Sequence, residues 1–515
     1  MTISRPLVRW AATPLAGVAM VLTFAPFGAW WLQPLLLAVL LHHWRTLPRG
    51  RAALAGFVFA MGWFGAGVSW VYVSMHDAGG MPAAIAGLAT LLFAAILAAY
   101  WALAGWVQSR IATPTWRHLL FVTPSAITLA EWLRSWVFTG FPWIGPGYAY
   151  TDGPLAGFAP LAGVFGMTYL AALLGALLAA GYATERKRQR ILVLGAVGLV
   201  MLGGHLLKTL AWTTPAGAPL QVRLVQGNIP QDLKFVPGRF ESTVERYLRL
   251  SDGSATQLIL LPETALPRML HAIPREVLER FDRLARQQGA TLITGVPRSE
   301  PALPAGAAAS GRRAAAPYFN SAVSLGLEAG QVYDKSHLVP FGEFIPFGFR
   351  WFVDLMNMPL GDFSRGGLGQ TPIQVAGQQI AVNICYEDLF GEEIITSLPK
   401  ATILANISNL AWFGDSLAPH QQLQASRMRA IEAGRPVLRA TNTGATAAID
   451  YDGRTINMLR FFTAGVLNTS VQGRSGMTPY ALGGNLPLIL FCVVALGWSA
   501  LARGAKRLLP ADAQG

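Results

Sequence analysis

The first 210 residues alternate between long apolar runs and short polar linkers. Most of the runs have about the 17 to 25 residues that a helix needs to cross a bilayer. They predict seven membrane-spanning helices, and a further apolar run near the C-terminus predicts an eighth. The eight predicted spans cover residues 9–26, 29–44, 53–74, 82–107, 118–138, 157–182, 191–210 and 482–502.

The segment between the seventh and eighth runs has a different pattern. Short apolar or β-branched runs such as "PLQVRLVQGNI", "QLILLPETALP", "IAVNICYED" and "ATILANIS" predict strands. They alternate with amphipathic stretches that predict helices, such as "PREVLERFDRLARQQG" and "HQQLQASRMRAIEAG". This alternation predicts a layered α/β fold. We therefore expect a membrane domain at 1–211, an α/β domain at 212–478, and a last helix with a tail at 479–515.

Composition and charge support a membrane protein. Hydrophobic residues make up 53% of the chain and charged residues 13%, which is too apolar for an ordinary soluble enzyme. The net charge of +13 does not indicate nucleic-acid binding, because the basic residues form short clusters between the apolar runs. Every second linker carries such a cluster: Arg5, Arg9, Arg45, Arg49, Arg51, Arg110, Arg117, Arg186, Lys187, Arg188, Arg190, Arg503, Lys506 and Arg507. The positive-inside bias then predicts cytoplasmic termini and an extracytoplasmic 212–478 segment.

Three residues in the α/β segment are candidates for covalent chemistry. Cys385 ends an apolar strand, but Glu387 and Asp388 follow it, and acidic neighbours disfavour a thiolate. Glu263 stands directly after a buried strand, where it can accept a thiol proton, and Lys335 can stabilise a thiolate or an oxyanion. Taken singly, Cys385 could be an inert buried thiol, Glu263 a turn cap and Lys335 a solvated lysine.

Other features of the chain exclude several alternatives. Cys492, the second of two cysteines, lies inside the last apolar run, which rules out a disulfide framework. There is no P-loop and no metal-ligand spacing. Glu131 and Arg134 are three residues apart in an apolar run, and the favoured interpretation is an ion pair that fixes helix packing.

Several motifs, in this order, make the chain similar to a known family. They include "FAPFGAWWL", "GFPWIGPGY", "VQGNIPQDLK", "LPETALP", "DKSHLVPFGEFIP", "ICYED", "WFGDS" and "RMRAIEAGRPVLRATNTG". Over essentially its whole length the chain resembles the apolipoprotein N-acyltransferases, the integral-membrane branch of the nitrilase superfamily. The resemblance implies a polytopic helical membrane domain and an extracytoplasmic α-β-β-α sandwich.

The resemblance also assigns roles to residues. It implies a triad of Glu263 as general base, Lys335 as oxyanion stabiliser and Cys385 as nucleophile. Glu343, Tyr386 and Glu387 match supporting positions. Phe235 and Trp412 are candidate substrate-binding residues. No metal or soluble cofactor is implied.

The implied reaction has two steps and two membrane-embedded partners. The thiolate takes an acyl chain from a phospholipid, typically the sn-1 chain of phosphatidylethanolamine, and the α-amino group of a diacylglyceryl-cysteine on an apolipoprotein then attacks the thioester. The implied location is the inner membrane, and we expect a monomer. The aromatic stretch 341–352 is expected to be a loop that dips toward lipid.

The chain departs from the family pattern at a few positions. Phe235 stands where the family usually has Trp, Leu410 and Ala411 precede "WF", and Gln422 replaces a common His. These changes leave the triad intact and concern the substrate mouth. Two rival functions remain open: a membrane-anchored amidase or hydrolase that uses the same triad with water as acceptor, and a transporter or scaffold whose α/β domain is inactive.

Overall fold

The computed structural model describes residues 5–111, 115–236, 238–300, 317–345 and 362–508. Most of the low-complexity segment 301–317 and much of the aromatic stretch 341–352, both predicted as loops, lie outside these ranges. The chain divides into two compact units. The first comprises residues 1–76, 82–211 and 478–515, and the second comprises residues 77–81 and 212–477.

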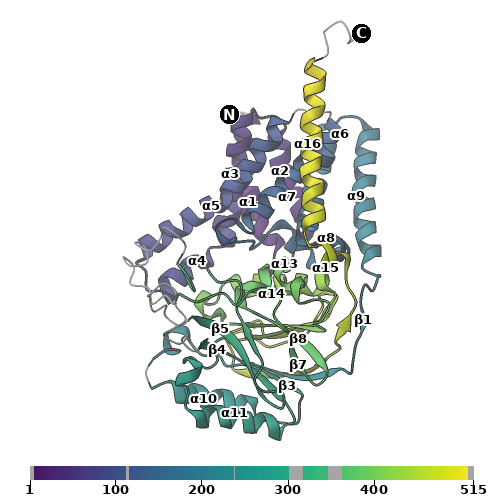
Figure 1. Cartoon of the computed structure of the whole chain (residues 1–515). Helices are drawn as coiled ribbons and strands as arrows, with labels where there is room; N and C mark the ends of the chain where they lie inside the picture. The colour runs from purple at the N-terminus through teal and green to yellow at the C-terminus, as the bar shows by residue number, and fades with distance from the viewer. Residues whose placement is uncertain (1–4, 112–114, 237, 301–316, 346–361, 509–515) are drawn as a thin grey trace, which may run out of the picture. The chain divides into compact units, whose positions relative to one another are not determined.

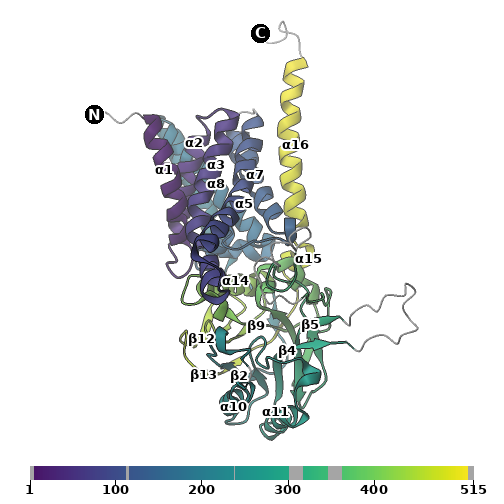
Figure 2. The same cartoon turned by 90° about the vertical axis from the view of Figure 1, so that its left-hand side faces the viewer.

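The first unit is helical (Figures 1 and 2). Its longer helices run side by side, with α3 packed on α1 and α5, α2 on α8, and α16 on α7. The helices of this unit are α1 (Arg5–Ala19), α2 (Gln33–Trp44), α3 (Arg49–Gly67), α4 (Trp70–Val73), α5 (Ala83–Arg110), α6 (Thr115–Arg117), α7 (Thr123–Arg134), α8 (Ala159–Ala183), α9 (Lys187–Leu207), α15 (Pro479–Gly483) and α16 (Leu486–Leu508).

Each of the eight predicted spans contains a helix, but not all of these helices are long and apolar enough to cross a bilayer. Within the described residues four pass that test, at Pro6–Thr23, Ala83–Arg110, Pro154–Ala183 and Lys187–Leu207. A fifth is added if the bent pair Arg49–Gly67 and Trp70–Ala78 is one span. Helix α2 has 12 residues, or about 18 Å of length, which is short of a bilayer core. Helix α7 continues α6 and a π-helical turn without a break from Thr115 to Arg134, but this segment is not among the helices that pass the test. The count of eight spans therefore stays a prediction.

Two features hold the helices of this unit together. Gly56 on α3 and Gly105 on α5 let the two backbones meet, because a Cβ atom on Gly56 would lie 2.4 Å from the Trp101 carbonyl oxygen. The ion pair predicted between Glu131 and Arg134 is confirmed, and both side chains are 1% exposed. The indole of Trp101 donates to Glu131 at 2.7 Å. The charges are thus compensated inside the helix bundle.

The second unit contains two six-stranded sheets and a two-stranded pair. One sheet has the order β13-β2-β3-β4-β5-β6, and the other has the order β12-β11-β10-β9-β8-β7. The strands are β1 (Thr214–Pro215), β2 (Leu220–Gln226), β3 (Leu258–Leu260), β4 (Thr291–Ser299), β5 (Tyr318–Gly326), β6 (Val332–Asp334), β7 (Ile373–Val375), β8 (Gln378–Ile384), β9 (Ile403–Ser408), β10 (Val437–Thr441), β11 (Ala447–Ile449), β12 (Thr455–Met458), β13 (Gly465–Val471) and β14 (Arg474–Ser475).

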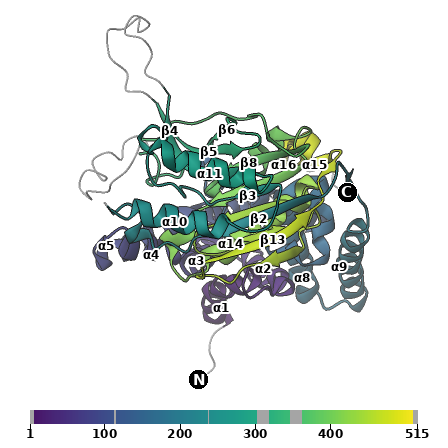
Figure 3. The same cartoon turned by 90° about the horizontal axis from the view of Figure 1, so that it is seen from below.

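Helices cover the outer faces of the two sheets. A core of Leu, Ile and Val residues from both sheets, including Leu224, Ile384 and Leu438, fills the space between them. A second core joins the first sheet to α10 (Phe240–Ser251) and α11 (Arg275–Gln287). Figure 3 shows these two helices from below, over β2 and β3. Helix α14 (Ala418–Ala433) packs on β10 of the other sheet. The α-β-β-α order that the resemblance implied is therefore present in this unit.

The parallel strands at the centre of each sheet position two of the predicted site residues. Strands β2, β3 and β4 run parallel, as do β8, β9 and β10. Glu263 follows the carboxyl end of β3, and Cys385 follows that of β8. Because side chains beyond the carboxyl ends of parallel strands gather at one edge, the fold draws these two residues toward the same place.

Candidate active site

Cys385 stands at a sharp turn between β8 and a 3₁₀ helix of residues Cys385–Leu389. Its φ of 55° lies in the left-handed region that residues other than glycine rarely adopt. Its carbonyl oxygen accepts hydrogen bonds from Gln422 Nε2 at 2.8 Å and Asn406 Nδ2 at 3.2 Å. Such strain persists only where the surroundings hold it in place, and these two amides hold the main chain that presents the thiol.

The Glu263 carboxylate lies close enough to this thiol to raise its pKa. Its Oε1 accepts from Asn320 Nδ2 at 2.7 Å, and its Oε2 accepts from the main-chain N–H of Asn409 at 2.9 Å. Glu263 is 7% exposed. The carboxylate is therefore oriented by two donors and has the thiol proton within reach, as a general base requires.

Lys335 completes the cluster and is 1% exposed. Its Nζ lies 3.6 Å from Glu263 Oε1 and 2.8 Å from Glu343 Oε2. Asn320 Nδ2 also donates to Glu343 at 2.8 Å, so one amide bridges the two carboxylates. The structure thus brings together the three predicted triad residues and Glu343, although they come from separate parts of the chain.

Burial and charge set the resting protonation states. Burial raises the pKa of Cys385 well above its ordinary value, and the Glu263 carboxylate raises it further while Lys335 opposes the shift. Burial lowers the pKa of Lys335, but Glu343 and Glu263 outweigh this effect and raise it above its usual range. The resting site therefore holds a neutral thiol beside an ammonium, and the thiolate has to form when the proton moves to Glu263.

Glu387 links the turn at Cys385 to the loop after Lys335. Its Oε1 accepts from the main-chain N–H groups of Ser336 at 2.6 Å and His337 at 2.9 Å. Its Oε2 accepts from the N–H of Ile384 at 2.6 Å and from the Tyr333 hydroxyl at 2.9 Å. Burial raises the pKa of Glu387 to about 7, although Lys335 and the three main-chain donors lower it. This carboxylate therefore acts as a clamp that holds together the two segments that carry Cys385 and Lys335.

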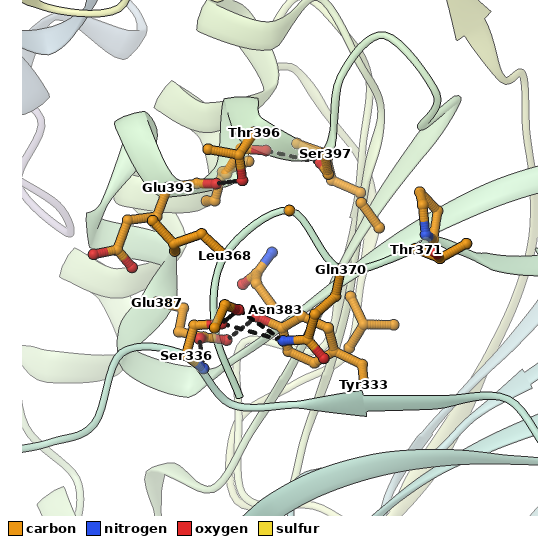
Figure 4. A pocket seen from close by; sticks show the side chains of 17 residues that line it. Tyr333, Ser336, Leu368, Gln370, Thr371, Asn383, Glu387, Glu393, Thr396 and Ser397 are labelled. Atoms are coloured by element: carbon orange, nitrogen blue, oxygen red, sulfur yellow. Dashed lines mark hydrogen bonds between the residues drawn. The ribbon is translucent and has the colours of Figure 1, made fainter. Parts of the chain in front are cut away.

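Glu387 also borders a pocket, shown in Figure 4 with Tyr333, Ser336, Gln370 and Thr396. The 17 residues that line this pocket in the described part of the chain do not include Glu263, Lys335 or Cys385. This pocket therefore lies beside the cluster rather than at the thiol.

The remaining predicted residues lie around the cluster. Tyr386 is 5% exposed, and its ring packs against His337 and Phe390. By contrast, Phe235 is 60% and Trp412 is 38% exposed. These two aromatic side chains are available to apolar ligands, whereas Tyr386 has a packing role.

The loops that carry Phe235 and Trp412 are fastened to each other and to Glu263. Gln231 Oε1 accepts from Asn409 Nδ2 at 2.7 Å, and the N–H of the same Asn409 binds Glu263. Of the departures from the family pattern, Leu410 is fully buried and Gln422 supports the Cys385 carbonyl. Leu410 is thus packed in the protein interior, and Gln422 helps to hold the main chain at Cys385.

Sequence reasoning missed three residues of this cluster: Asn320, Asn409 and Lys234. Asn320 is a polar residue inside the apolar strand β5, and that irregularity is a signal that could have found it. Lys234 lies in the motif "VQGNIPQDLK", is 3% exposed and donates to the main-chain oxygen of Glu263 at 3.2 Å. Asn409 binds Glu263 through its main chain, so its side-chain identity carried no signal.

Both parts of the chain match models of known protein domains. Residues 221–480 match the domain described as carbon-nitrogen hydrolase, and residues 16–177 match the apolipoprotein N-acyltransferase N-terminal domain. The fold and the site thus define a carbon–nitrogen hydrolase domain joined to a unit of apolar helices.

Curated relatives match nearly the whole chain. A protein of Ralstonia nicotianae named apolipoprotein N-acyltransferase is 47% identical over 97% of this chain and 95% of its own. Proteins with the same name from Nitrosomonas europaea and Methylococcus capsulatus are 44% and 42% identical over 95% and 93% of this chain, and 97% and 94% of their own. The chain belongs to the apolipoprotein N-acyltransferase family. As a member it is an enzyme of the N-acyltransferase class.

Proposed function

We propose that the chain transfers a fatty acyl group from a phospholipid, through a thioester on Cys385, to the α-amino group of a diacylated apolipoprotein. The observation that carries the proposal is the convergence of three groups: the Glu263 carboxylate, which raises the pKa of the partly buried Cys385 thiol, and the Lys335 ammonium, which lies 3.6 Å from that carboxylate. A thiol, a base and a cation in this arrangement are the groups that acyl transfer needs.

The first step acylates the enzyme. Glu263 takes the thiol proton, the sulfur attacks the ester carbonyl carbon, and the C–S bond forms as the carbonyl oxygen becomes an oxyanion. The Lys335 ammonium stabilises that oxyanion. When the ester C–O bond breaks, Glu263 returns its proton to the leaving oxygen, and a lysophospholipid with a free hydroxyl departs.

The second step transfers the acyl group. The neutral α-amino group of the acceptor attacks the thioester carbonyl, and Glu263 accepts a proton from the nitrogen. The C–S bond breaks, the amide remains, and the sulfur regains the proton. A thioester conserves the activation of the ester, so no nucleotide is needed. Phe235 and Trp412, both partly exposed, would border the apolar chain.

The proposal also covers the membrane topology and the cellular location of the enzyme. Eight spans, with both termini in the cytoplasm and residues 212–478 in the periplasm, follow from the alternation of basic and uncharged linkers. On this proposal 1–211 and 479–515 form the membrane domain of an inner-membrane monomer, and both substrates reach 212–478 from the bilayer. Cysteine accessibility labelling of the linkers in intact cells tests the topology, and a basic linker labelled from outside would overturn it.

Intact-mass spectrometry tests the chemistry. Wild-type protein exposed to phosphatidylethanolamine should gain one fatty-acyl mass that hydroxylamine removes, and Cys385→Ala should gain none. Cys492→Ala is the matched control, because it removes the other cysteine, which is buried in α16, and should keep the adduct. An adduct that persists in Cys385→Ala would place the nucleophile elsewhere.

A diacylated lipopeptide added to the acylated enzyme separates transfer from hydrolysis. Transfer adds the acyl mass to the peptide amine and clears the enzyme. Loss of the enzyme adduct with free fatty acid as the only product would instead identify a hydrolase. The same experiment excludes an inactive scaffold if any acyl group moves.

A further inference from the structure

Lys234 is a buried cation that the two steps above leave unused. It follows the 3₁₀ turn Gln231–Leu233 and is 3% exposed. Among the described residues its ammonium donates a hydrogen bond only to the main-chain oxygen of Glu263, at 3.2 Å, and pairs with no carboxylate. A buried charge without an ion pair is costly, so its presence calls for a reason.

Lys335 differs from Lys234 in its partners. The ammonium of Lys335 lies 2.8 Å from Glu343 and 3.6 Å from Glu263, so two carboxylates compensate it. Glu263, Glu343 and Lys335 together carry one net negative charge when both carboxylates are ionised. Transfer of the thiol proton to Glu263 moves one negative charge to Cys385 and leaves that net charge unchanged. A second cation is needed to make the site neutral.

Burial lowers the pKa of the Lys234 ammonium, whereas Glu263 and Cys385 raise it. They follow strands of different sheets, β3 and β8, and are the two residues between which the thiol proton moves in the proposed reaction. An electrostatic interaction is mutual, so a group that the thiolate stabilises also stabilises the thiolate.

We propose that Lys234 is a second cationic group of the active site, which offsets the net negative charge of the cluster and favours the Cys385 thiolate. Lys234 is a positioning residue in this role, because it acts on the reacting sulfur through charge and holds the Glu263 main chain. The inference rests on the proposed function, since it takes Cys385 as the nucleophile.

The proposed role of Lys234 predicts how the rate of Cys385 acylation depends on pH. Burial lowers the pKa of Lys234 to about 8, against the raising effect of Glu263 and Cys385. The cation is therefore present at neutral pH and is lost as the pH rises through about 8. Single-turnover acylation of the wild type by phosphatidylethanolamine should fall over that range.

Three substitutions separate charge from hydrogen bonding. Lys234→Arg keeps the charge to high pH, Lys234→Gln keeps a donor without the charge, and Lys234→Met keeps neither. We expect Lys234→Gln and Lys234→Met to acylate about tenfold more slowly at pH 7, the effect of one unit in the thiol pKa. Lys234→Arg should stay within threefold of the wild type and lose the decline above pH 8.

Each outcome decides the proposal. A wild-type rate and an unchanged profile in Lys234→Gln would overturn it, as would an unchanged decline in Lys234→Arg. If Lys234→Met does not fold, the comparison of Lys234→Arg with the wild type still decides, because a purely structural lysine would not set an alkaline limb. Absence of any Cys385 adduct in the wild type would refute the proposed function rather than the role of Lys234.

Discussion

Replacement of Glu387 by Gln tests whether the active site depends on its clamp. The carboxylate accepts four hydrogen bonds, from the N–H groups of Ser336, His337 and Ile384 and from the Tyr333 hydroxyl. An amide has one acceptor oxygen, and its NH₂ group repels any N–H that faces it. The substitution is nearly isosteric, so it changes hydrogen bonding without a change of volume.

The structure indicates which way the amide will turn. If Nε2 replaced Oε1, it would oppose the N–H groups of both Ser336 and His337. If it replaces Oε2, it opposes only the N–H of Ile384, because the Tyr333 hydroxyl can rotate and accept. One buried N–H is then unsatisfied, at a cost of about 1–3 kcal/mol. Removal of a buried carboxylate offsets part of this, so the net change in stability should be small.

The effect on activity should be larger than the effect on stability. Ile384 immediately precedes Cys385, so a shift that relieves the unsatisfied N–H moves the nucleophile. A displacement of about 1 Å can cost about a hundredfold in rate. We expect acylation of Cys385 in Glu387→Gln to be 10- to 100-fold slower (about 1.4 to 2.7 kcal/mol), with a melting temperature within a few degrees of the wild type.

Single-turnover acylation by phosphatidylethanolamine, followed by intact mass, measures this rate. Glu393→Gln is the matched control, because Glu393 lines the same pocket and binds His337 Nδ1 at 2.7 Å, while its side chain forms no described hydrogen bond or ion pair with residues Cys385–Leu389. That variant should stay within threefold of the wild type. A Glu387→Gln rate equally close to the wild type would refute the clamp.

Three further predictions concern the framework of the site. Gly295→Ala should slow acylation about a hundredfold, because the new Cβ would lie 2.6 Å from the Cα of Glu263 and displace the base; an unimpaired rate would contradict this. Arg439→Met should destabilise the protein by about 3–5 kcal/mol in denaturant unfolding, because it leaves the Asp388 carboxylate buried without its partner. The double variant with Asp388→Asn should recover most of that loss, and equal stability of the single and double variants would refute the argument. The folded state raises the pKa of Glu387 from 4.5 to about 7, so the folded protein binds this proton more tightly than the unfolded chain. Its contribution to stability is therefore present below pH 4.5 and lost as the pH rises to about 7, and thermal unfolding of Glu387→Gln should lack this loss.

Much of the fold could be predicted from local patterns. Apolar runs marked the helices of the first unit, and short β-branched runs marked strands such as β8 and β9. These predictions succeed because periodicity and run length reflect which faces of an element are buried. The sheet partners could not be predicted in this way. Strand β13 pairs antiparallel with β2 across more than 230 residues, and nothing within either strand specifies that partner.

The proposed triad was within reach of sequence reasoning because Glu263 and Cys385 each follow a strand in a recognisable motif. The electrostatic environment of the Cys385 thiol could not be predicted from the sequence. The sequence predicted that the two acidic residues after Cys385 disfavour a thiolate, yet Asp388 forms an ion pair with Arg439 and Glu387 binds main-chain N–H groups. Their charges are compensated elsewhere, and the carboxylates that act on the thiol are Glu263 and Glu343.

The chain alone thus determined the apolar helices, the strand and helix pattern and the candidates for the reacting groups, because each of these follows from residues close together in sequence. Tertiary structure decided which charges face one another, including the approach of Lys234 to Glu263. The physical reason is that burial and electrostatic interaction depend on distances in space, and those distances exist only once remote segments have packed.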